Sequence, residues 1–381
     1  MSVKIFTGKS YKYKIGFIGG GIDSLIGATH FRSIALHTKL ELVSGIFSIN
    51  KEINYKSAKV YNVPKNRVYT DIDTFLKNEK KLDAIVLITP IPGRLKILSK
   101  IFKSKIPLIA EKPLVANLKE IKSIKSLIKK DNFLSVIYNY TGYPMVREMK
   151  DLINRKDFFG KLKSVLIEMP SGVFHQKQVS KRRANWNIKD GIIPNVALNL
   201  GSHVFNLLYF LTGQTTDKLI AQSSKSFKYK NTIDDLMCIG NLKNNANFNI
   251  WFSKAALGHD NGMKIRVYGE NASLEWTQTK PEYLIISTNK KQTFKMDRGS
   301  SFAKTSKQKR YNYFIPGHPT GYLEAFANHY YDIFENLECF KKKTKFKNNY
   351  TFGYDHAAQV IASLDALNRS TKSKKWEKVK Y

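Results

Sequence analysis

The strongest constraint on this chain is a short apolar run that ends in consecutive glycines. Residues 13–19 read Tyr-Lys-Ile-Gly-Phe-Ile-Gly, and Gly20 and Gly21 follow directly. An apolar run closed by glycines is typical of a buried parallel strand that turns sharply. Residues 24–37 then carry apolar side chains in a helical stretch. This segment is therefore predicted to be a strand, a glycine turn and a helix.

The alternation of strand and helix continues to about residue 138. Apolar runs predict further strands at 40–49, 84–89, 106–110 and 134–138, with helical patterns at 58–61, 95–102 and 118–128 between them. Strands that alternate with helices favour a doubly wound parallel sheet. We therefore predict a dinucleotide-binding, Rossmann-type α/β domain over residues 1–138.

The pattern changes after Pro144. Strand-like segments follow one another, mostly without helices between them, at 162–169, 237–242, 246–252, 263–268, 272–278 and 283–287. Helices are predicted at 145–153, 201–211, 322–337 and 354–367. This pattern favours an α+β domain over residues 139–381, with a large, mainly antiparallel open sheet. We expect this domain to bind the substrate. An apolar open sheet face tends to pair with a second copy, so we also expect a homodimer or homotetramer.

Composition excludes several classes of protein. The net charge is +34, but the lysines are spread along the 381 residues and form no basic stripe with interleaved aromatics, so we expect no nucleic-acid partner. No apolar run reaches the roughly 18 residues of a membrane helix, so no membrane partner is expected. The two cysteines, Cys238 and Cys339, cannot build a disulfide framework. A cytoplasmic location is therefore expected, with a charge that favours anionic substrates.

The glycine loop points to a bound dinucleotide. The segment Gly19-Gly20-Gly21-Ile22-Asp23-Ser24 has the G-x-G-x-x-G arrangement, with Ser at the third glycine position. The first glycine permits the turn, and the second lets the backbone approach a pyrophosphate that the helix N-terminus stabilises. The loop therefore predicts a nicotinamide dinucleotide as cofactor.

The end of the second predicted strand bears on the choice between NAD and NADP. It reads Phe47-Ser48-Ile49-Asn50-Lys51 and lacks the acid that usually binds the ribose of NAD. Ser48 or Asn50 is available for the ribose hydroxyls, and Lys51 is available for a 2′-phosphate. NAD and NADP both remain open, with NAD favoured.

Two further segments carry candidate catalytic groups. Glu111-Lys112-Pro113 directly follows the strand at 106–110, and ligands bind at the carboxyl ends of parallel strands. His203 follows Gly201 at the start of an apolar helix. Taken alone, the sequence around Lys112 fits a surface lysine at a strand end as well as a catalytic one. Taken alone, His203 fits a packed or capping histidine better than a catalytic one.

Together these segments resemble the Gfo/Idh/MocA family of sugar and cyclitol dehydrogenases along nearly the whole chain. The glycine loop, Thr89-Pro90, Glu111-Lys112-Pro113 and the Gly-x-His before an apolar helix follow the order and spacing of the family. The segments at 138–144, 267–276 and 316–326 resemble the branch that includes levoglucosan dehydrogenase and glucose-6-phosphate 3-dehydrogenase.

The resemblance implies an NAD(P)-dependent oxidoreductase acting on a ring hydroxyl of a sugar, sugar derivative or cyclitol, without a metal. It implies that His203 is the general base and that Lys112 binds the reacting oxygen. The other residues to which it gives a role are Asn199 beside the base, Thr89, Pro90, Glu111 and Asn139 at the cofactor, and Tyr143, Trp186, Asn187 and His318 at the substrate.

The chain departs from the family in three places. Asn199 stands where the family has Asp, Asn187 stands where it has Arg, and residues 91–94 replace a common Asn-x-x-His. Asn199 can orient the imidazole of His203 but supplies no charge to it. One alternative is therefore a catalytically weakened homologue that binds a dinucleotide and a sugar. A nucleic-acid-binding protein is a third interpretation, which rests on the net charge alone.

Overall fold

The computed structural model describes residues 12–36, 39–175, 189–226 and 231–380. Contacts divide the chain into two units. Unit 1 consists of Met1–Glu111, Leu127–Ser135 and Tyr330–Asn348, and unit 2 consists of Lys112–Ser126, Val136–His329 and Asn349–Tyr381. The chain first crosses from unit 1 to unit 2 at the peptide bond between Glu111 and Lys112.

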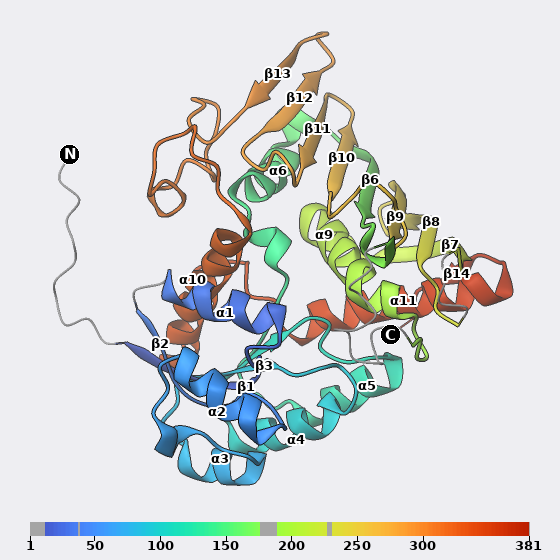
Figure 1. The fold of residues 1–381 in the computed structure, drawn as a ribbon. Coiled ribbons are helices and arrows are strands. Elements are labelled where there is room, and N and C mark those ends of the chain that lie inside the picture. Colours follow the sequence, from blue (N-terminus) through green and yellow to red (C-terminus); the bar gives the residue numbers. More distant parts are fainter. Residues whose placement is uncertain (1–11, 37–38, 176–188, 227–230, 381) are drawn as a thin grey trace. The chain divides into compact units, whose positions relative to one another are not determined.

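A five-stranded sheet follows from the alternating N-terminal pattern. Its strands are β1 (Tyr13–Gly19), β2 (Leu40–Ile46), β3 (Ala84–Ile88), β4 (Leu108–Glu111) and β5 (Leu134–Ile137). Their order is β2-β1-β3-β4-β5, and Figure 1 labels β1, β2 and β3 of this sheet; the pairs β1–β2, β1–β3 and β3–β4 are parallel. The direction of winding reverses between β1 and β3, and α/β sheets bind ligands at such a switch point. The carboxyl ends of β1 and β3 are therefore the place to look for a cofactor.

The helices of this N-terminal part are α1 (Leu25–Ala35), α2 (Lys51–Val60), α3 (Ile72–Asn78), α4 (Arg94–Ser104) and α5 (Leu118–Leu127), with a short 3-10 turn at Lys65–Arg67. The helix expected at 58–61 is longer, because Asn50 caps its first turn by accepting a 3.0 Å hydrogen bond from the Ile53 amide. The sequence pattern did not predict α3, which Asp71 caps in the same way at Thr74.

The second sheet belongs to the C-terminal part. Among the described residues its strands are β6 (Leu162–Pro170), β7 (Thr216–Ser224), β8 (Asp235–Leu242), β9 (Asn247–Ser253), β10 (Lys264–Gly269), β11 (Ala272–Thr277), β12 (Leu284–Thr288), β13 (Thr293–Met296) and β14 (Glu377–Lys378). Their order is β13-β12-β11-β10-β6-β9-β8-β7-β14. The β6–β9 pair is parallel, and the other pairs are antiparallel. The predicted fold class, a parallel Rossmann sheet followed by a mainly antiparallel sheet, is confirmed.

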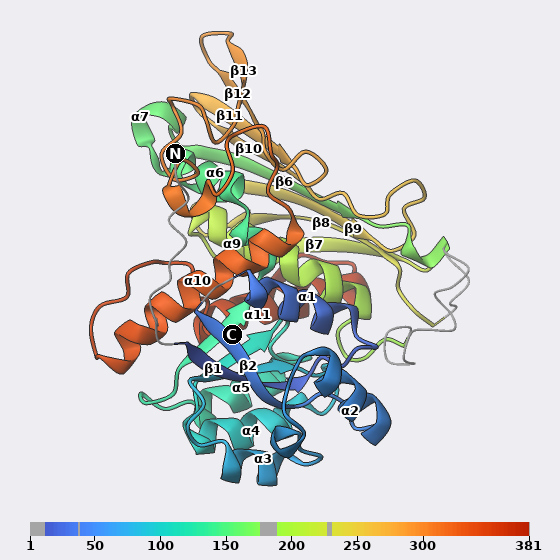
Figure 2. The same ribbon diagram turned by 60° about the vertical axis from the view of Figure 1, so that its left-hand side comes forward.

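The helices of the C-terminal part are α6 (Pro144–Asn154), α7 (Lys156–Phe159), α9 (Ser202–Thr212), α10 (Tyr322–Lys341) and α11 (Tyr354–Ser373). Short turns accompany them at Asn139–Gly142 (η2), Val173–His175 (η3), Ala197–Gly201 (η5) and Lys309–Tyr311 (η6). Helices α6, α7, α9 and α11 pack against strands of the large sheet, as Figure 2 shows for α9 and α11.

Burial alternates along the strands of the large sheet. In β8, Leu236 and Cys238 are buried, whereas Met237 and Ile239 between them are 48% and 49% exposed. Successive side chains of a strand point to opposite faces. One face of the sheet therefore forms the core with the helices, and the other is partly exposed. The sequence pattern did not predict the strand β7, because most of its outward positions are polar.

Candidate functional site

The glycine loop after β1 lies at the switch point of the parallel sheet. Gly19 and Gly20 have φ angles of +86° and +75°, a conformation that side-chain-bearing residues rarely adopt. A Cβ at Gly19 would lie 2.7 Å from the backbone carbon of Ile88, at the end of β3. A Cβ at Gly21 would lie 3.0 Å from the carbonyl oxygen of Phe47. The loop thus has no room for side chains and brings the backbone to the end of β1.

The start of α1 completes this cradle. Ser24 caps the helix, and its hydroxyl accepts a 3.2 Å hydrogen bond from the amide of Gly27. A Cβ at Gly27 would overlap the carbonyl oxygen of Gly20, so Gly27 provides the close helix–strand packing. The sequence motif places Ser24 at its third glycine position, and the role of Gly27 was not predicted. Glycines that admit close backbone approach, followed by a helix N-terminus, fit a pyrophosphate group.

Helix α2 also holds the glycine loop. The hydroxyl of Tyr61 donates a 2.9 Å hydrogen bond to the carbonyl of Gly20, and the amide of Ile22 donates to the hydroxyl of Ser57 at 3.0 Å. Burial, with a smaller contribution from the nearby charge of Asp23, raises the pKa of Tyr61 to about 12. Tyr61 therefore remains a hydrogen-bond donor across the neutral range, and the loop is fixed from two sides.

The predicted ribose-binding residues lie beyond the end of β2. The hydroxyl of Ser48 accepts a 3.2 Å hydrogen bond from the amide of Asn50, and the carboxamide oxygen of Asn50 caps α2. Asn54 was not predicted. It is buried, accepts a 2.7 Å hydrogen bond from the amide of Phe47, and donates to the carbonyl of Tyr69 at 2.8 Å. The turn after β2 is therefore shaped by Asn54 rather than by an acidic residue.

Arg94 links the carboxyl ends of β3 and β4. Its guanidinium is buried and donates to the carbonyl of Glu111 at 2.7 Å and to the carbonyl of Thr89. Thr89 is half-buried, and Pro90 is exposed. Arg94 stands at one of the departures from the family pattern, where the sequence alone showed only that a common histidine was missing. Its structural role is to fix two strand ends at which ligands of such sheets bind.

The side chain of Glu111 points into unit 1. Its carboxylate lies 3.3 Å from Nε2 of His30, and Nδ1 of His30 lies 2.6 Å from the hydroxyl of Tyr330. All three side chains are buried. Burial, and secondarily the carboxylate of Glu111, raises the pKa of Tyr330 well above its ordinary value. The buried chain Glu111–His30–Tyr330 anchors the residue that directly precedes Lys112.

In unit 2, Lys112 lies at η5, the π-helical turn that leads into α9. Its ammonium donates a 2.7 Å hydrogen bond to the main-chain carbonyl of Asn199 and lies 3.5 Å from the carboxamide oxygen of the same residue. Turns of π-helix are frequent at functional sites, because they aim backbone groups away from the regular ladder. The structure thus brings two of the predicted residues together, although they are far apart in the sequence.

His203 lies in the first turn of α9 and is 7% exposed. Burial, and secondarily the positive charge of Lys112, holds the pKa of His203 well below its ordinary value. Among the described residues, no hydrogen bond joins Asn199 to His203, and the polar contacts of Asn199 are with Lys112 and Ser202. The imidazole is therefore neutral at neutral pH and beside a cation, without a carboxylate to charge it.

Aromatic rings surround His203. The ring of Tyr140 meets the imidazole edge to face, with centroids 4.8 Å apart and an interplanar angle of 83°. Tyr143 stacks on Tyr140 and packs against Trp276 at 5.1 Å. Burial raises the pKa of Tyr140 to about 12 and that of Tyr143 further. Tyr143 was predicted as a site residue, whereas Tyr140 and Trp276 were not, because their roles follow from contacts with His203 and Tyr143.

The remaining predicted residues are placed as follows. Asn139 begins η2 and is buried. His318 is exposed in the segment before α10, and its carbonyl accepts a 2.7 Å hydrogen bond from Arg298, which is paired with Glu282 at 2.8 Å. Trp186 and Asn187 lie outside the described residues. No group of metal-binding side chains occurs in the described part of the chain.

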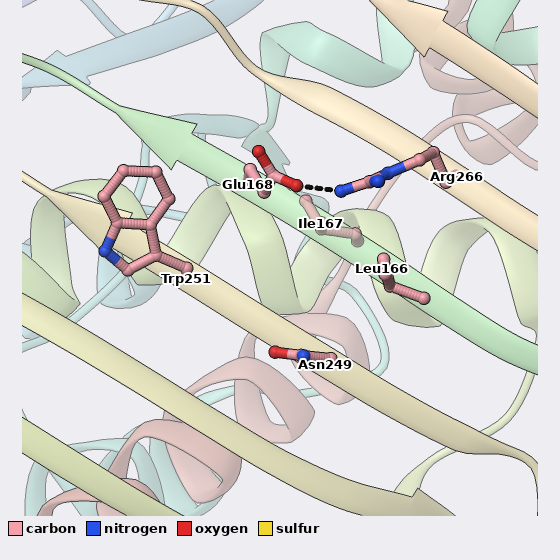
Figure 3. A pocket seen from close by; sticks show the side chains of 6 residues that line it. All are labelled: Leu166, Ile167, Glu168, Asn249, Trp251 and Arg266. Atoms are coloured by element: carbon pink, nitrogen blue, oxygen red, sulfur yellow. Dashed lines mark hydrogen bonds and ion pairs between the residues drawn. The ribbon is translucent and has the colours of Figure 1, made fainter.

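A shallow hollow lies on the exposed face of the large sheet, on β6, β9 and β10. Its lining residues are Leu166, Ile167, Glu168, Asn249, Trp251 and Arg266 (Figure 3). An ion pair between Glu168 and Arg266 crosses from β6 to β10. None of the candidate catalytic residues lines this hollow. Within the described ranges, no helix has the length and apolarity needed to cross a membrane.

Known structures share this fold over nearly the whole chain. An oxidoreductase from Sinorhizobium meliloti is 27% identical, with a TM-score of 0.84 over 96% of this chain and 99% of that one. An inositol dehydrogenase homologue from Azotobacter vinelandii, in complex with NADH and myo-inositol, is 21% identical, with a TM-score of 0.86 over 97% and 98%. Levoglucosan dehydrogenase, in complex with NADH and L-sorbose, is 16% identical, with a TM-score of 0.83 over 97% and 99%.

Family models cover both sheets. The model of the oxidoreductase family, NAD-binding Rossmann fold, matches residues 13–140, and the model of its C-terminal alpha/beta domain matches residues 150–380. The resemblance inferred from the sequence is thereby confirmed at the level of the family, and the cofactor of the N-terminal domain is NAD. The chain belongs to the Gfo/Idh/MocA oxidoreductase family.

Proposed function

We propose that this protein is an NAD-dependent dehydrogenase that oxidises a ring hydroxyl of a sugar, sugar derivative or cyclitol. The observation that carries the proposal is that the ammonium of Lys112 binds the carbonyl of Asn199, four residues before the nearly buried His203, whose pKa its charge helps to lower. A neutral imidazole accepts a proton, and a nearby cation stabilises negative charge on oxygen. Residues 1–138 would bind the dinucleotide, and residues 139–381 would bind the substrate.

The proposed reaction converts a secondary alcohol and NAD⁺ into a ketone, NADH and a proton. His203 takes the proton of the hydroxyl group, and Lys112 donates a hydrogen bond to the same oxygen as its charge develops. The nicotinamide, when bound, supplies the acceptor for the hydride that leaves the carbon. The strand ends that would border the cofactor include Thr89, Pro90 and Glu111. Asn139, in η2, would also contact the cofactor.

The proposed substrate surface is aromatic. Tyr143 is 2% exposed and packs against Trp276, so a sugar or cyclitol would meet only the accessible edge of this aromatic cluster, and apolar rings stack on the C–H faces of such ligands. The family resemblance supports three further substrate contacts, which we propose are Trp186, Asn187 and His318. The same resemblance supports the branch that includes levoglucosan dehydrogenase and glucose-6-phosphate 3-dehydrogenase. We further propose that the protein is cytoplasmic and that its partners are small molecules.

We also propose that the exposed face of the large sheet pairs with a second copy of this chain. Met237 and Ile239 present apolar groups on this face, next to the hollow at Trp251 and the Glu168–Arg266 pair. Apolar groups and charges of both signs on one face can complement the same face of a twin. A homodimer or homotetramer would follow.

One alternative has a specific observation in its favour. Asn199 gives His203 no carboxylate, and its carbonyl holds Lys112. A homologue that binds NAD and a sugar without turnover would have this arrangement as well. The two functions differ in turnover and not in binding, so a kinetic measurement separates them.

The test is a panel of sugars and cyclitols, with formation of NADH as the signal. We expect turnover on at least one compound. Lys112→Met should lower kcat by about 10²-fold or more while NAD affinity stays within about tenfold, because the lost group acts on developing charge. Lys163→Met, which removes a lysine paired with Glu270 at the surface, is the matched control and should retain activity. Binding of NAD and of a sugar without any turnover would instead establish the alternative.

A further inference from the structure

Two residues of α9 leave buried polar atoms without partners. Nδ1 of His203 has no hydrogen-bond partner among the described residues, and neither does either polar atom of the Asn206 carboxamide. Asn206 is only 1% exposed. Buried polar groups are nearly always hydrogen-bonded, to protein or to ordered water. Three such atoms on one helix therefore call for a common explanation.

The spacing on α9 supplies that explanation. Residues three apart on a helix are neighbours on one face, with Cβ atoms roughly 5–6 Å apart. His203 and Asn206 have this spacing within Ser202–Thr212. A carboxamide oxygen is an acceptor, and Nδ1 of a neutral imidazole is a donor in one of its two tautomers. The unpartnered atoms are therefore chemically complementary and belong to neighbouring side chains on one face of the helix.

We propose, on the basis of the function given above, that Asn206 is the positioning residue of His203. Its carboxamide oxygen accepts the hydrogen bond of Nδ1–H, either after a turn of the side chain or across one water molecule. This bond fixes the tautomer in which Nε2 carries the free electron pair. His203 then receives the substrate proton at Nε2. Asn206 orients the imidazole without contributing a charge.

The charged surroundings fit this arrangement. Among the described residues, Lys112 is the charged group that acts on His203, and the ring of Tyr140 is the ionisable group that touches it from η2. Charged groups on the other elements packed against α9, such as Lys150 on α6, lie against other rings: Lys150 is 4.1 Å from the centre of Phe210. A neutral acceptor orients the imidazole while leaving it uncharged, which a carboxylate would not do.

The experiment uses the full chain with ¹⁵N-labelled histidine, and it needs no substrate. Nitrogen chemical shifts report which ring nitrogen of His203 carries the proton, and His203→Asn assigns the signal. We expect the wild type to hold Nδ1–H. Asn206→Leu should lose this preference and lower kcat by about tenfold or more at nearly unchanged KM, in line with the size of general-base effects. Asn368→Leu, a buried asparagine of α11, is the matched control.

Asn206→Asp tests the same bond in a variant that should fold, because Asp has nearly the same size and shape as Asn. The carboxylate should keep the Nδ1–H tautomer and raise the pKa of His203 in the NMR titration. An unchanged tautomer in Asn206→Leu, or an unchanged pKa in Asn206→Asp, overturns the proposal. If the shifts change as expected but no compound of the panel is oxidised by the wild type, the proposed function fails while the Asn206 contact stands.

Discussion

The residue that decides the chemistry is His203, and its charge state follows from its surroundings. An imidazole loses charge when it is buried and when a cation is near, and both conditions hold here. The absence of a carboxylate at position 199 reinforces this state. A base of this kind is weaker than a carboxylate-paired histidine, yet it stays unprotonated over a wider acidic range.

This charge state predicts the pH dependence of alcohol oxidation. Because the pKa of His203 lies below the ordinary 6.5, the imidazole gains a proton only at a lower pH, and activity should be lost as the pH falls through that lowered value. Lys112→Met removes the like charge and should move the pKa upward, although burial will keep it depressed. An NMR titration of His203 measures both values, and the pH–rate profile of the wild type measures the acidic limb.

The control for this titration is Lys150→Met. Lys150 is also largely buried, and burial followed by the charge of Arg147 lowers its pKa to about 8. Its charge does not act on His203, so the His203 titration should not move in this variant. A wild-type pKa at or above 6.5 would contradict the assigned surroundings of the imidazole.

Among the elements, the junction of β1, the glycine loop and α1 is tightly packed and sensitive to substitution. Gly27→Ala adds a Cβ that overlaps the Gly20 carbonyl. The helix must then move away from the loop, which displaces the N-terminus that would hold the pyrophosphate. We expect NAD affinity to fall by tenfold or more, about 1.4 kcal/mol, as measured by fluorescence titration.

Gly191→Ala is the matched control for that junction. The nearest atom to a Cβ at Gly191 is 3.9 Å away, an ordinary contact distance. Its NAD affinity should equal that of the wild type. Equal affinities in the Gly27 and Gly191 variants would show that the close packing at Gly27 does not shape the cofactor loop.

Local patterns predicted those elements whose signal lies in a few consecutive residues. β1 and β3 are apolar runs buried on both faces, so their residues alone revealed them. β7 was missed because most of its outward positions are polar, and α3 because it has one buried side chain, Phe75. In the site, Lys112 and His203 were found from motifs. Tyr140, Arg94 and Asn206 gain their meaning from partners distant in sequence or from burial, which no local pattern contains.

At the scale of the whole molecule, the exposed sheet face governs assembly. Ile239→Glu places a charge in the middle of the apolar part of this face, and burying an unpaired charge is costly. We expect the wild type to sediment as a dimer or larger oligomer and this variant to shift toward the monomer. Analytical ultracentrifugation measures both. Asn241→Glu, on the same strand but near its end, is the control, and a monomeric wild type would contradict the proposed pairing.

The packing of Trp276 against Tyr143 gives the protein an intrinsic optical reporter. Trp276 is fully buried, and its indole N–H donates to the carbonyl of Pro281 at 3.0 Å, whereas Trp251 and Trp376 are partly exposed. Emission from Trp276 therefore lies toward the blue and escapes aqueous quenchers that reach Trp251 and Trp376, while Trp186 lies outside the described residues. A compound that stacks on Tyr143 changes the surroundings of this one indole. Quencher-resistant fluorescence can thus be used to screen ligands before any reaction is known.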